Sequence, residues 1–388
     1  MTTSSCTLPG MDFEAMDAIP INPGGIVDPM NIVGREAEIH CILGDLARGS
    51  GVHQPGERRH GKTSVSRAVQ VRARERGWTV VQRSVEGMRT TDAVLEALTT
   101  GLTDQLPNMI RARAWLKSRA DVKLGGVSVR AEPTTLDDVV VEACEHAPRV
   151  LLILDELPIC ARALEQSEPG AGLAFLHSLR RMRQDNAKLT MLCLGSIGFH
   201  HVVPSLQGAL NDLQTRALHP LAEAGARELA TRLLKSTDIP LGIRRDLAEP
   251  MARLSEGVPF YLHHLADGCD RRACRSEPLS GDDVTRMVDD AITDPDDPWD
   301  LKHYVTRLPD YYGAEAPAAA AILDHVAQTP SDRHAIETGL TAQSDEIAAA
   351  DAIGLLGRLE QDHYLVNEAG RRRFRSELVR RAWLRWRT

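Results

Sequence analysis

One eight-residue stretch has the composition and spacing of a phosphate-binding loop. Residues 56–63 read GERRHGKT and fit the pattern G-x-x-x-x-G-K-[ST]. Two glycines let the main chain approach an anion closely, and a helix beginning at Lys62 would point the positive end of its dipole at that anion. We expect Lys62 to reach the β- and γ-phosphates of a nucleotide and the Thr63 hydroxyl to ligate Mg²⁺. A chance match in a glycine turn is disfavoured, because helical periodicity follows directly.

A pair of carboxylates ends an apolar run further along the chain. The run 150–154 leads directly into Asp155 and Glu156. Beside a phosphate loop, Asp155 could hold Mg²⁺, and Glu156 could polarise the water that attacks the γ-phosphorus. Alone, two carboxylates at a strand end could merely begin a turn. Together with the loop they favour hydrolysis of ATP as well as binding.

A hydroxyl marks the end of the next predicted strand. The apolar run 189–194 leads into Gly195 and Ser196. Ligands of open α/β sheets collect at the carboxyl ends of the strands. The Ser196 hydroxyl is therefore a candidate contact for the γ-phosphate or the attacking water. An ordinary turn at the strand end explains the same residues nearly as well.

The elements that must position these groups alternate between strands and helices. Runs with strand character occupy 78–81, 150–154 and 189–194, and helix-like stretches occupy 63–76, 91–106, 136–145 and 172–184. Such alternation predicts an α/β fold with a parallel sheet covered on both faces. A helix is also expected over 32–46, and residues 123–130 have the pattern of a small hairpin. Residues 50–55, SGVHQP, are mostly polar, so the strand before the loop is expected to be short or distorted.

The second half of the chain changes pattern twice. Helical periodicity dominates 222–234, 244–254 and 259–273, and an acidic, proline-containing stretch follows at 289–300. The remainder suits three helices, a strand pair at 363–366 and 372–375, and a last helix. We therefore predict an irregular lead-in (1–28), a P-loop ATPase core (29–216), an all-α helical lid (217–293), an acidic linker with a connecting helix (294–315) and a winged helix-turn-helix domain (316–388).

Composition excludes several classes of protein. The 388 residues carry a formal net charge of -8, so the chain as a whole lacks a basic field for nucleic acid, although a local patch could still serve. Seven cysteines lie far apart without the spacing of zinc ligands, which favours reduced thiols in a cytoplasmic protein. Neither a membrane-spanning run nor a secretory signal is recognised.

Together these residues resemble a known family. From about residue 20 to the end, the sequence is similar to the STAND-type ATPases, a branch related to AAA+, and especially to their archaeal-ATPase-like group. Residues 31–36, NIVGRE, resemble the glycine-arginine-glutamate motif whose backbone lies near adenine. Residues 257–261, GVPFY, look like the glycine-x-proline motif of the lid, where the proline packs by the nucleotide. The tail from 374, with two tryptophans, is similar to the group's winged-helix terminus.

The motifs and this resemblance together imply a set of functional residues. Lys62, Glu156 and Ser196 would be catalytic, and Thr63 and Asp155 would hold Mg²⁺. The residues expected to contact ATP or ADP are Val33, Gly34, Arg35, Gly56, Arg58, Arg59, His60, Gly61, Lys62, Thr63, Ser64, Gly257 and Pro259.

The resemblance further implies a slow, regulatory ATPase that works as a switch. ADP would hold it closed, and ATP would permit opening and assembly into an oligomer. A homo-oligomer or a separate sensor or effector protein would be its partner, and stress response or antiphage defence would suit that arrangement. The alternative is a DNA-binding AAA+ ATPase, an origin-type loader or a transposition target selector, which would act through its winged helix. Loaders usually carry a γ-phosphate-sensing arginine in the lid, and residues 255–262 offer none, which favours the switch.

Several charged clusters have weaker claims. The arginines of 180–183 could supply an arginine finger to a neighbouring subunit, although such a run is more often a solvated face. Arg216 could contact phosphate within the same chain. The arginines of 371–387 could form a DNA-binding surface or a docking surface.

Two histidine pairs, 200–201 and 263–264, could suggest metal. Adjacent histidines point different ways on a helix or strand, and no carboxylate has suitable spacing, so metal is not expected there.

Overall fold

The chain forms two compact units, each assembled from segments that are separated in the sequence. The computed structural model describes residues 16–106, 123–124, 127–128, 135–196, 198–201, 211–341 and 352–387. The larger unit, which we call the sheet unit, comprises Asp28–His219 and Arg307–Arg375. The other, which we call the helical unit, comprises Met1–Val27, Pro220–Thr306 and Ser376–Thr388.

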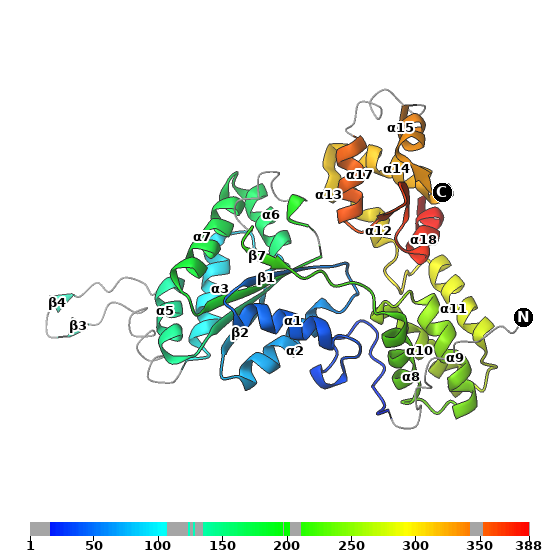
Figure 1. Ribbon diagram of the computed structural model, residues 1–388, viewed down its shortest axis with the longest axis horizontal. Helices are drawn as coiled ribbons and strands as arrows, with labels where there is room; N and C mark the ends of the chain where they lie inside the picture. Colours follow the sequence, from blue (N-terminus) through cyan, green and yellow to red (C-terminus); the bar gives the residue numbers. More distant parts are fainter. Residues whose placement is uncertain are drawn as a thin grey trace, which may run out of the picture. The chain divides into compact units, whose positions relative to one another are not determined.

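A five-stranded parallel sheet is the centre of the sheet unit (Figure 1), in the order β2-β5-β6-β1-β7. The strands are β1 (Gly51–Pro55), β2 (Thr79–Ser84), β5 (Val150–Asp155), β6 (Leu189–Gly195) and β7 (Leu213–Thr215). Every neighbouring pair in this sheet is parallel, so all five carboxyl ends meet at one edge. The predicted α/β class with a parallel sheet is confirmed.

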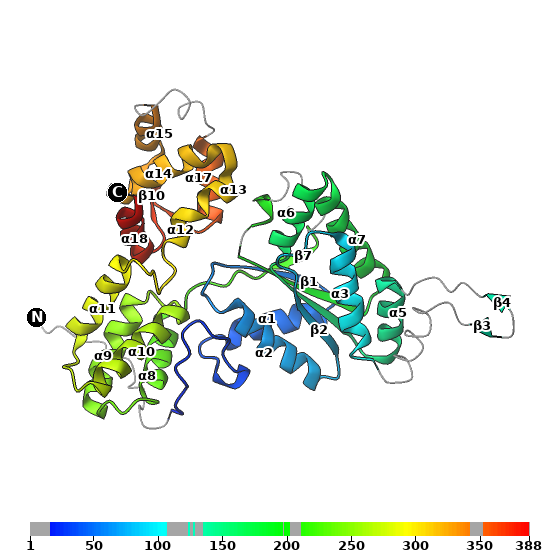
Figure 2. The same cartoon turned by 180° about the vertical axis from the view of Figure 1, so that it is seen from behind.

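Two separate helical layers cover the two faces of the sheet (Figures 1 and 2), and alternate residues of the central strands pack against each layer. On one face, Leu151 and Ile153 pack with α1 (Glu36–Ala47) and α2 (Lys62–Glu75). On the other, Leu152 and its alternate neighbours in β5 pack with the remaining helices, α3 (Thr91–Thr103), α5 (Leu136–His146), α6 (Leu157–Ser167) and α7 (Ala171–Asp185). Successive side chains of a strand point to opposite faces, so a strand covered on both sides requires an unbroken apolar run.

The strand before the phosphate loop is regular, so the expectation of a short or distorted strand is wrong. β1 lies between β6 and β7 and pairs with β6 from Val52↔Leu192 to Pro55↔Gly195. Main-chain pairing on both sides stabilises the strand despite its polar side chains. One of these, Gln54, is fully buried, and its amide has no hydrogen-bond partner among the described residues.

Two elements of the sheet unit carry little sequence signal and were not predicted. Helix α6 begins directly after Glu156 and includes a proline in its first turn. Strand β7 has only three residues, none of them buried. The small hairpin expected at 123–130 is present as β3 (Lys123–Leu124) and β4 (Val127–Ser128), which pair antiparallel.

The helical unit contains α8 (Glu223–Leu234), α9 (Leu241–Leu254), α10 (Pro259–Cys274), α11 (Gly281–Thr293), α12 (His303–Thr306) and α18 (Glu377–Arg387). The acidic stretch at 289–300 begins inside a helix, since α11 continues to Thr293, and the predicted linker begins at the next residue. Val284, Val288 and Ile292 lie on the buried face of α11, which explains why its aspartates do not break it. The last helix, α18, packs against α11 and α12.

Residues 307–375 form a small mixed region of the sheet unit. Its helices are α13 (Leu308–Tyr312), α14 (Ala316–Gln328), α15 (Arg333–Thr341) and α17 (Ala352–Gln361). Its strands, β8 (Ser331–Asp332), β9 (Leu365–Glu368) and β10 (Arg371–Phe374), form an antiparallel sheet in the order β8-β10-β9. Short 3-10 helices are η1 (Pro29–Asn31), η2 (Phe199–His201) and η4 (Gly313–Glu315). Within the described ranges, no helix combines the length and apolar character needed to cross a membrane.

Candidate functional site

Strand β1, the loop after it and helix α2 place the glycine-rich motif at the carboxyl edge of the sheet. Helix α2 begins at Lys62, and its N-cap residue, Gly61, has φ of 86° and no side-chain cap hydrogen bond. Because Gly61 has no side chain that could cap this helix end, a bound anion could take that place, and the helix dipole favours one. A Cβ on Gly61 would meet nothing within 4 Å, so its glycine is required by the left-handed backbone and not by packing.

The first glycine of the motif has a different reason to be glycine. A Cβ on Gly56 would meet the carbonyl oxygen of Leu218 at 3.0 Å. The Leu218 amide in turn donates to the Pro55 carbonyl at 2.9 Å. The segment after β7 therefore packs directly on the start of the loop, and a side chain at 56 would require this segment to move.

The lysine of the motif lies inside its own loop. Lys62 is 7% exposed, and its Nζ atom donates to the carbonyl oxygens of Gly56 at 2.7 Å and Glu57 at 2.8 Å. Burial lowers the pKa of Lys62 to about 8, against the opposing effect of Glu156 and Asp155. A poorly solvated ammonium group gains from an anionic partner, which is the property a phosphate-binding lysine needs.

A hydroxyl and a carboxylate come together as a candidate metal site. Thr63, in the first turn of α2, donates through Oγ1 to Oδ2 of Asp155, the last residue of β5, at 3.1 Å. Burial, and then the charge of Glu156, raise the pKa of Asp155. A divalent cation would relieve both effects, and Mg²⁺ prefers such hard oxygen donors. The residues present therefore fit Mg²⁺ held by Thr63 and Asp155.

Glu156 turns out of β5 toward the end of the neighbouring strand. It has φ of 58°, a left-handed conformation that is uncommon for a side-chain-bearing residue. Its Oε2 atom accepts hydrogen bonds from both the amide and the hydroxyl of Ser196, each at 2.8 Å. The structure therefore brings the predicted general base and the predicted polar sensor into direct contact. In this arrangement the Ser196 amide and hydroxyl both hold the Glu156 carboxylate.

The N-terminal motif is tied to the loop through one buried arginine. Arg35 is 3% exposed, and its guanidinium donates to the carbonyl oxygens of His60 at 3.3 Å and His219 at 2.7 Å. It also pairs with Glu38 at 3.0 Å, and burial lowers its pKa. Through these bonds Arg35 stabilises the conformation of the loop. Next to it, Val33 is buried, while Gly34 is exposed with φ of 66°.

His60 also braces the loop. Its Nδ1 atom lies 3.0 Å from the carbonyl oxygen of Arg58, and its Nε2 atom lies 3.4 Å from Glu57. Burial lowers the pKa of His60 to about 3, so the ring is neutral near pH 7 and offers no charge to a phosphate. Arg59, by contrast, is exposed with φ of 73°, and Ser64 is half-buried in the first turn of α2.

The two predicted lid contacts lie in the helical unit, where their own packing accounts for them. A Cβ on Gly257, which has φ of 72°, would lie 2.3 Å from the carbonyl oxygen of Leu221. The Leu221 amide donates to the Gly257 carbonyl at 2.8 Å. Pro259 is the first residue of α10, a position where its missing N–H has no cost.

Residues of the 307–375 region approach the same edge of the sheet, and no sequence signal indicated this. Burial raises the pKa of Tyr311, and the charges of Arg58 and Glu156 also act on it. Arg162 of α6 donates to the carbonyl oxygen of Asp310 and lies over the Tyr311 ring, 5.8 Å from its centroid. Such contacts join segments far apart in the chain, so spacing rules could not find them.

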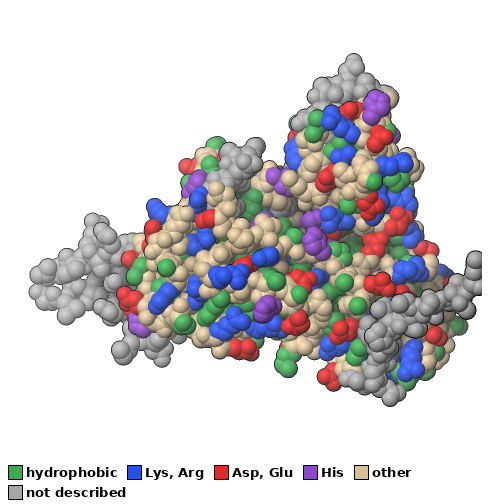
Figure 3. Space-filling model, viewed as in Figure 1, with side chains coloured by type: hydrophobic (Ala, Val, Ile, Leu, Met, Phe, Trp, Pro, Cys, Tyr) green, Lys and Arg blue, Asp and Glu red, His purple; other side chains and the backbone are tan. Residues whose placement is uncertain are grey.

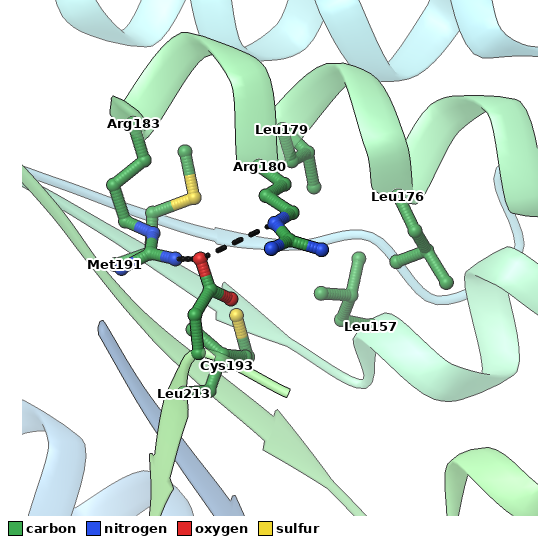
Figure 4. A pocket seen from close by; sticks show the side chains of 9 residues that line it. Leu157, Leu176, Leu179, Arg180, Arg183, Met191, Cys193 and Leu213 are labelled. Carbon is green, nitrogen blue, oxygen red and sulfur yellow. Dashed lines mark hydrogen bonds and ion pairs between the residues drawn. The ribbon is translucent and has the colours of Figure 1, made fainter. Parts of the chain in front are cut away.

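The arginines considered for trans or cis phosphate contact have partners within the sheet unit. Figure 4 shows Arg180 and Arg183 projecting from α7 into a small pocket. Both pair with Asp212, Arg180 at 3.5 Å. The apolar lining of this pocket is Leu157, Leu176, Leu179, Met191, Cys193 and Leu213. Arg216, considered for a phosphate contact within the chain, pairs with Asp45 of α1 at 2.7 Å.

Comparison with known proteins identifies the fold. No protein-family model and no curated protein matches this sequence. Among solved structures, the Walker-type ATPase of Pyrococcus abyssi is similar with a TM-score of 0.63 and 16% identity, over 96% of this chain and 100% of that one. The ORC2 protein of Aeropyrum pernix, in ADPNP–ADP complexes, is similar with a TM-score of 0.52 and 14% identity, over 91% and 92%. The chain therefore shares the fold of these two proteins, one of which is a Walker-type ATPase.

Proposed function

We propose that this chain is a Mg²⁺-dependent ATPase that acts as a regulatory switch of the STAND type. The observation that carries the proposal is one sheet edge that combines the anion-binding loop, the Thr63–Asp155 pair and Glu156 held by Ser196. The shared fold with a Walker-type ATPase supports it. The ORC2 structure with ADPNP and ADP is a further parallel.

The residues divide the chemistry among themselves. Bound Mg²⁺ would neutralise the charge of the phosphates when ATP is present. Lys62 would exchange its two carbonyl partners for phosphate oxygens, while Thr63 and Asp155 hold the ion. Glu156 would orient the attacking water once its carboxylate leaves Ser196. Because Glu156 is engaged in the present arrangement, basal turnover is expected to be slow.

The region 307–375 could couple the state of the nucleotide to assembly or to contact with a partner protein. The charges of Arg58 and Glu156 act on the Tyr311 hydroxyl. These two charged residues flank the place where the γ-phosphate would be expected. A nucleotide can shift an equilibrium only if it interacts differently with the two states. Loss of the γ-phosphate changes the charge beside Tyr311, so the docking of 307–375 is a suitable two-state element. We infer that its release controls assembly into an oligomer or contact with a separate protein.

The DNA-binding alternative has less support from the charges. Figure 3 shows basic and acidic side chains intermixed on the face in view. Several C-terminal arginines have carboxylate partners within their own unit: Arg372 with Glu360, Arg373 with Glu368, Arg380 with Glu377 and Arg381 with Asp289. A surface that binds phosphate backbones needs uncompensated positive charge.

Mass and exchange measurements with defined nucleotides test the switch. We expect the full chain to change its mass in light scattering, or the hydrogen exchange of 307–375, between ADP and a non-hydrolysable ATP analogue in magnesium buffer. The Lys62→Ala variant is the control and should not respond. Absence of nucleotide binding would overturn the proposal. Equal masses and equal exchange, with tight and salt-sensitive DNA binding, would instead support the alternative.

A further inference from the structure

Two adjacent histidines and a distant aspartate form a second cluster of ligating side chains. His200 and His201 lie in η2, shortly after β6, and Asp362 directly follows α17. The Nε2 atom of His201 is 2.6 Å from Oδ2 of Asp362, and the Nε2 atom of His200 is 3.1 Å from Oδ1. One ligand atom from each residue lies within 4.8 Å of the other two. The sequence-based expectation of no metal here missed Asp362, which is 161 residues from His201.

The hydrogen bonds of His201 define which ring nitrogen carries its proton. Its Nδ1 atom lies 3.1 Å from the carbonyl oxygen of Tyr311. A carbonyl oxygen only accepts, so Nδ1 must donate. In a neutral ring, Nε2 then presents a lone pair to a carboxylate oxygen at 2.6 Å. Both side chains are almost fully buried, 2% and 3% exposed, so a cation is needed between these two acceptors.

The second histidine adds a third ligand atom to the cluster. The rings of His200 and His201 are 4.3 Å apart, and both direct Nε2 at the same carboxylate. The Nε2 atom of His200 is buried and has no hydrogen-bond partner among the described residues. One divalent ion would satisfy both neutral rings and the carboxylate together.

The surroundings resemble the supporting shell of a metal site. Metal-bound histidines usually donate their other N–H to a carbonyl or carboxylate, as His201 does to Tyr311. The Tyr312 hydroxyl donates to Oδ2 of Asp362 at 2.6 Å and so orients the carboxylate.

We propose that His200, His201 and Asp362 bind one divalent transition-metal ion, with Zn²⁺ as the expected species. Two imidazole nitrogens and one carboxylate oxygen suit Zn²⁺, whereas Mg²⁺ prefers oxygen donors alone. The His200 side chain is 25% exposed, but its Nε2 atom is itself buried beside the carboxylate. The ion joins the end of β6 to the 307–375 region. It is independent of the nucleotide proposal, because none of its ligands belongs to the phosphate loop or the acidic pair.

A metal titration of the full chain tests this site. After removal of metals by a chelator, Zn²⁺ is added in excess Mg²⁺, and binding is followed by calorimetry and by elemental analysis after gel filtration. We expect one high-affinity Zn²⁺ per chain and a rise in the melting temperature. Asp362→Ala and His201→Ala should each weaken that site at least about 100-fold. The exposed His334→Ala on α15 is the matched control and should bind as the wild type does.

Further measurements separate a metal site from a structural ion pair. Cobalt(II) should give visible absorption bands in the wild type that Asp362→Ala lacks. If alanine at the buried position 362 prevents folding, the conservative Asp362→Asn and the more exposed His200→Ala replace it. Circular dichroism verifies that each variant is folded. No Zn²⁺ uptake, or uptake that folded variants of all three ligands leave unchanged, would overturn the proposal and leave a protonated His201 as the cation.

Discussion

Gly61 and Gly257 were both expected to contact the nucleotide, yet the two regions use glycine in different ways. Both have a left-handed backbone, with φ of 86° and 72°. A side chain at 61 would meet nothing within 4 Å, whereas one at 257 would meet the Leu221 carbonyl oxygen at 2.3 Å. The loop around Gly61 thus leaves space next to this glycine. The turn at Gly257 instead packs tightly against the backbone of Leu221.

The buried polar groups of the two regions also differ in whether their partners leave them available to a ligand. In the loop, the desolvated Lys62 ammonium has only carbonyl partners, and its attraction to an anion remains available. In the helical unit, the His263 ring accepts a hydrogen bond from the Asn22 amide at 3.1 Å and completes a local contact. Substitutions in the loop region should therefore change binding and turnover, and substitutions in the helical unit should change stability.

The largest expected effect is that of Lys62→Ala on nucleotide affinity. Loss of the ammonium should weaken binding of Mg·ADP by at least about 100-fold, or about 2.7 kcal/mol, in calorimetry. The melting temperature without nucleotide should change little. Lys188→Ala is the control, because exposed Lys188 donates to the Cys144 and Ala147 carbonyls away from the loop. Near-normal affinity in Lys62→Ala would show that the Lys62 ammonium does not bind the nucleotide, which is the premise of the comparison between the two regions.

Glu156→Gln separates chemistry from binding at the same edge. The amide keeps the size of the side chain but cannot act as a base, so turnover should fall by about 100-fold or more while affinity is kept. Phosphate release assays measure the first quantity and calorimetry the second. Glu168→Gln, at the exposed end of α6, should leave both unchanged. Unaltered turnover would remove Glu156 from its assigned role.

The two glycines themselves provide a direct contrast. Gly257→Ala should destabilise the chain by about 3 kcal/mol or more, because it adds a backbone collision to left-handed strain. Gly61→Ala should cost only about 1 kcal/mol in stability yet strongly weaken nucleotide binding, because it changes the shape of the loop. Thermal melting and calorimetry on both variants measure the contrast. Equal loss of stability in the two would contradict it.

Acid should weaken the helical unit through His263. Burial lowers the pKa of His263 to about 4. An unfolded histidine titrates near 6.5, so between these values the unfolded chain binds a proton that the folded chain does not. Stability is therefore retained above about pH 6.5 and lost as the pH falls toward 4, by about 2 kcal/mol from this group between pH 7 and pH 5.

The variant His263→Asn keeps an acceptor for the Asn22 amide without this titration. Its melting temperature should consequently fall less between pH 7 and pH 5 than that of the wild type. His334→Asn, at an exposed position of α15, should follow the wild type. Identical pH profiles for His263→Asn and the wild type would show that His263 is not the titrating group.

The smallest expected effect belongs to Ser196→Ala. Its hydroxyl provides one of two bonds that hold Glu156, so its loss should free the carboxylate and raise basal turnover up to about fivefold, the equivalent of one hydrogen bond. Ser178→Ala, whose hydroxyl bonds the Phe175 carbonyl on α7, is the control. A fall in turnover would instead favour the direct phosphate contact expected from the sequence.

The sequence alone was sufficient to predict the helix that begins at Lys62 after a glycine turn, the acidic pair at the end of β5 and the α/β class. The constraints on the loop lie within eight neighbouring residues, because a left-handed glycine, a lysine and a helix start must follow one another in the chain. The apolar run of β5 likewise requires cover on both faces whatever its neighbours are. Such local requirements can be read without knowing which segments meet.

Only the tertiary structure determined the contacts between residues that lie far apart in the sequence. Asp362 beside His201, Arg162 over Tyr311 and α18 among the lid helices have no signature in spacing or periodicity. Strand β1 was misjudged for a related reason, since hydrogen bonds from β6 and β7 stabilise a polar strand that its own side chains do not specify. Side-chain patterns report which face is buried, but main-chain pairing and long-range docking depend on the partner that the fold supplies.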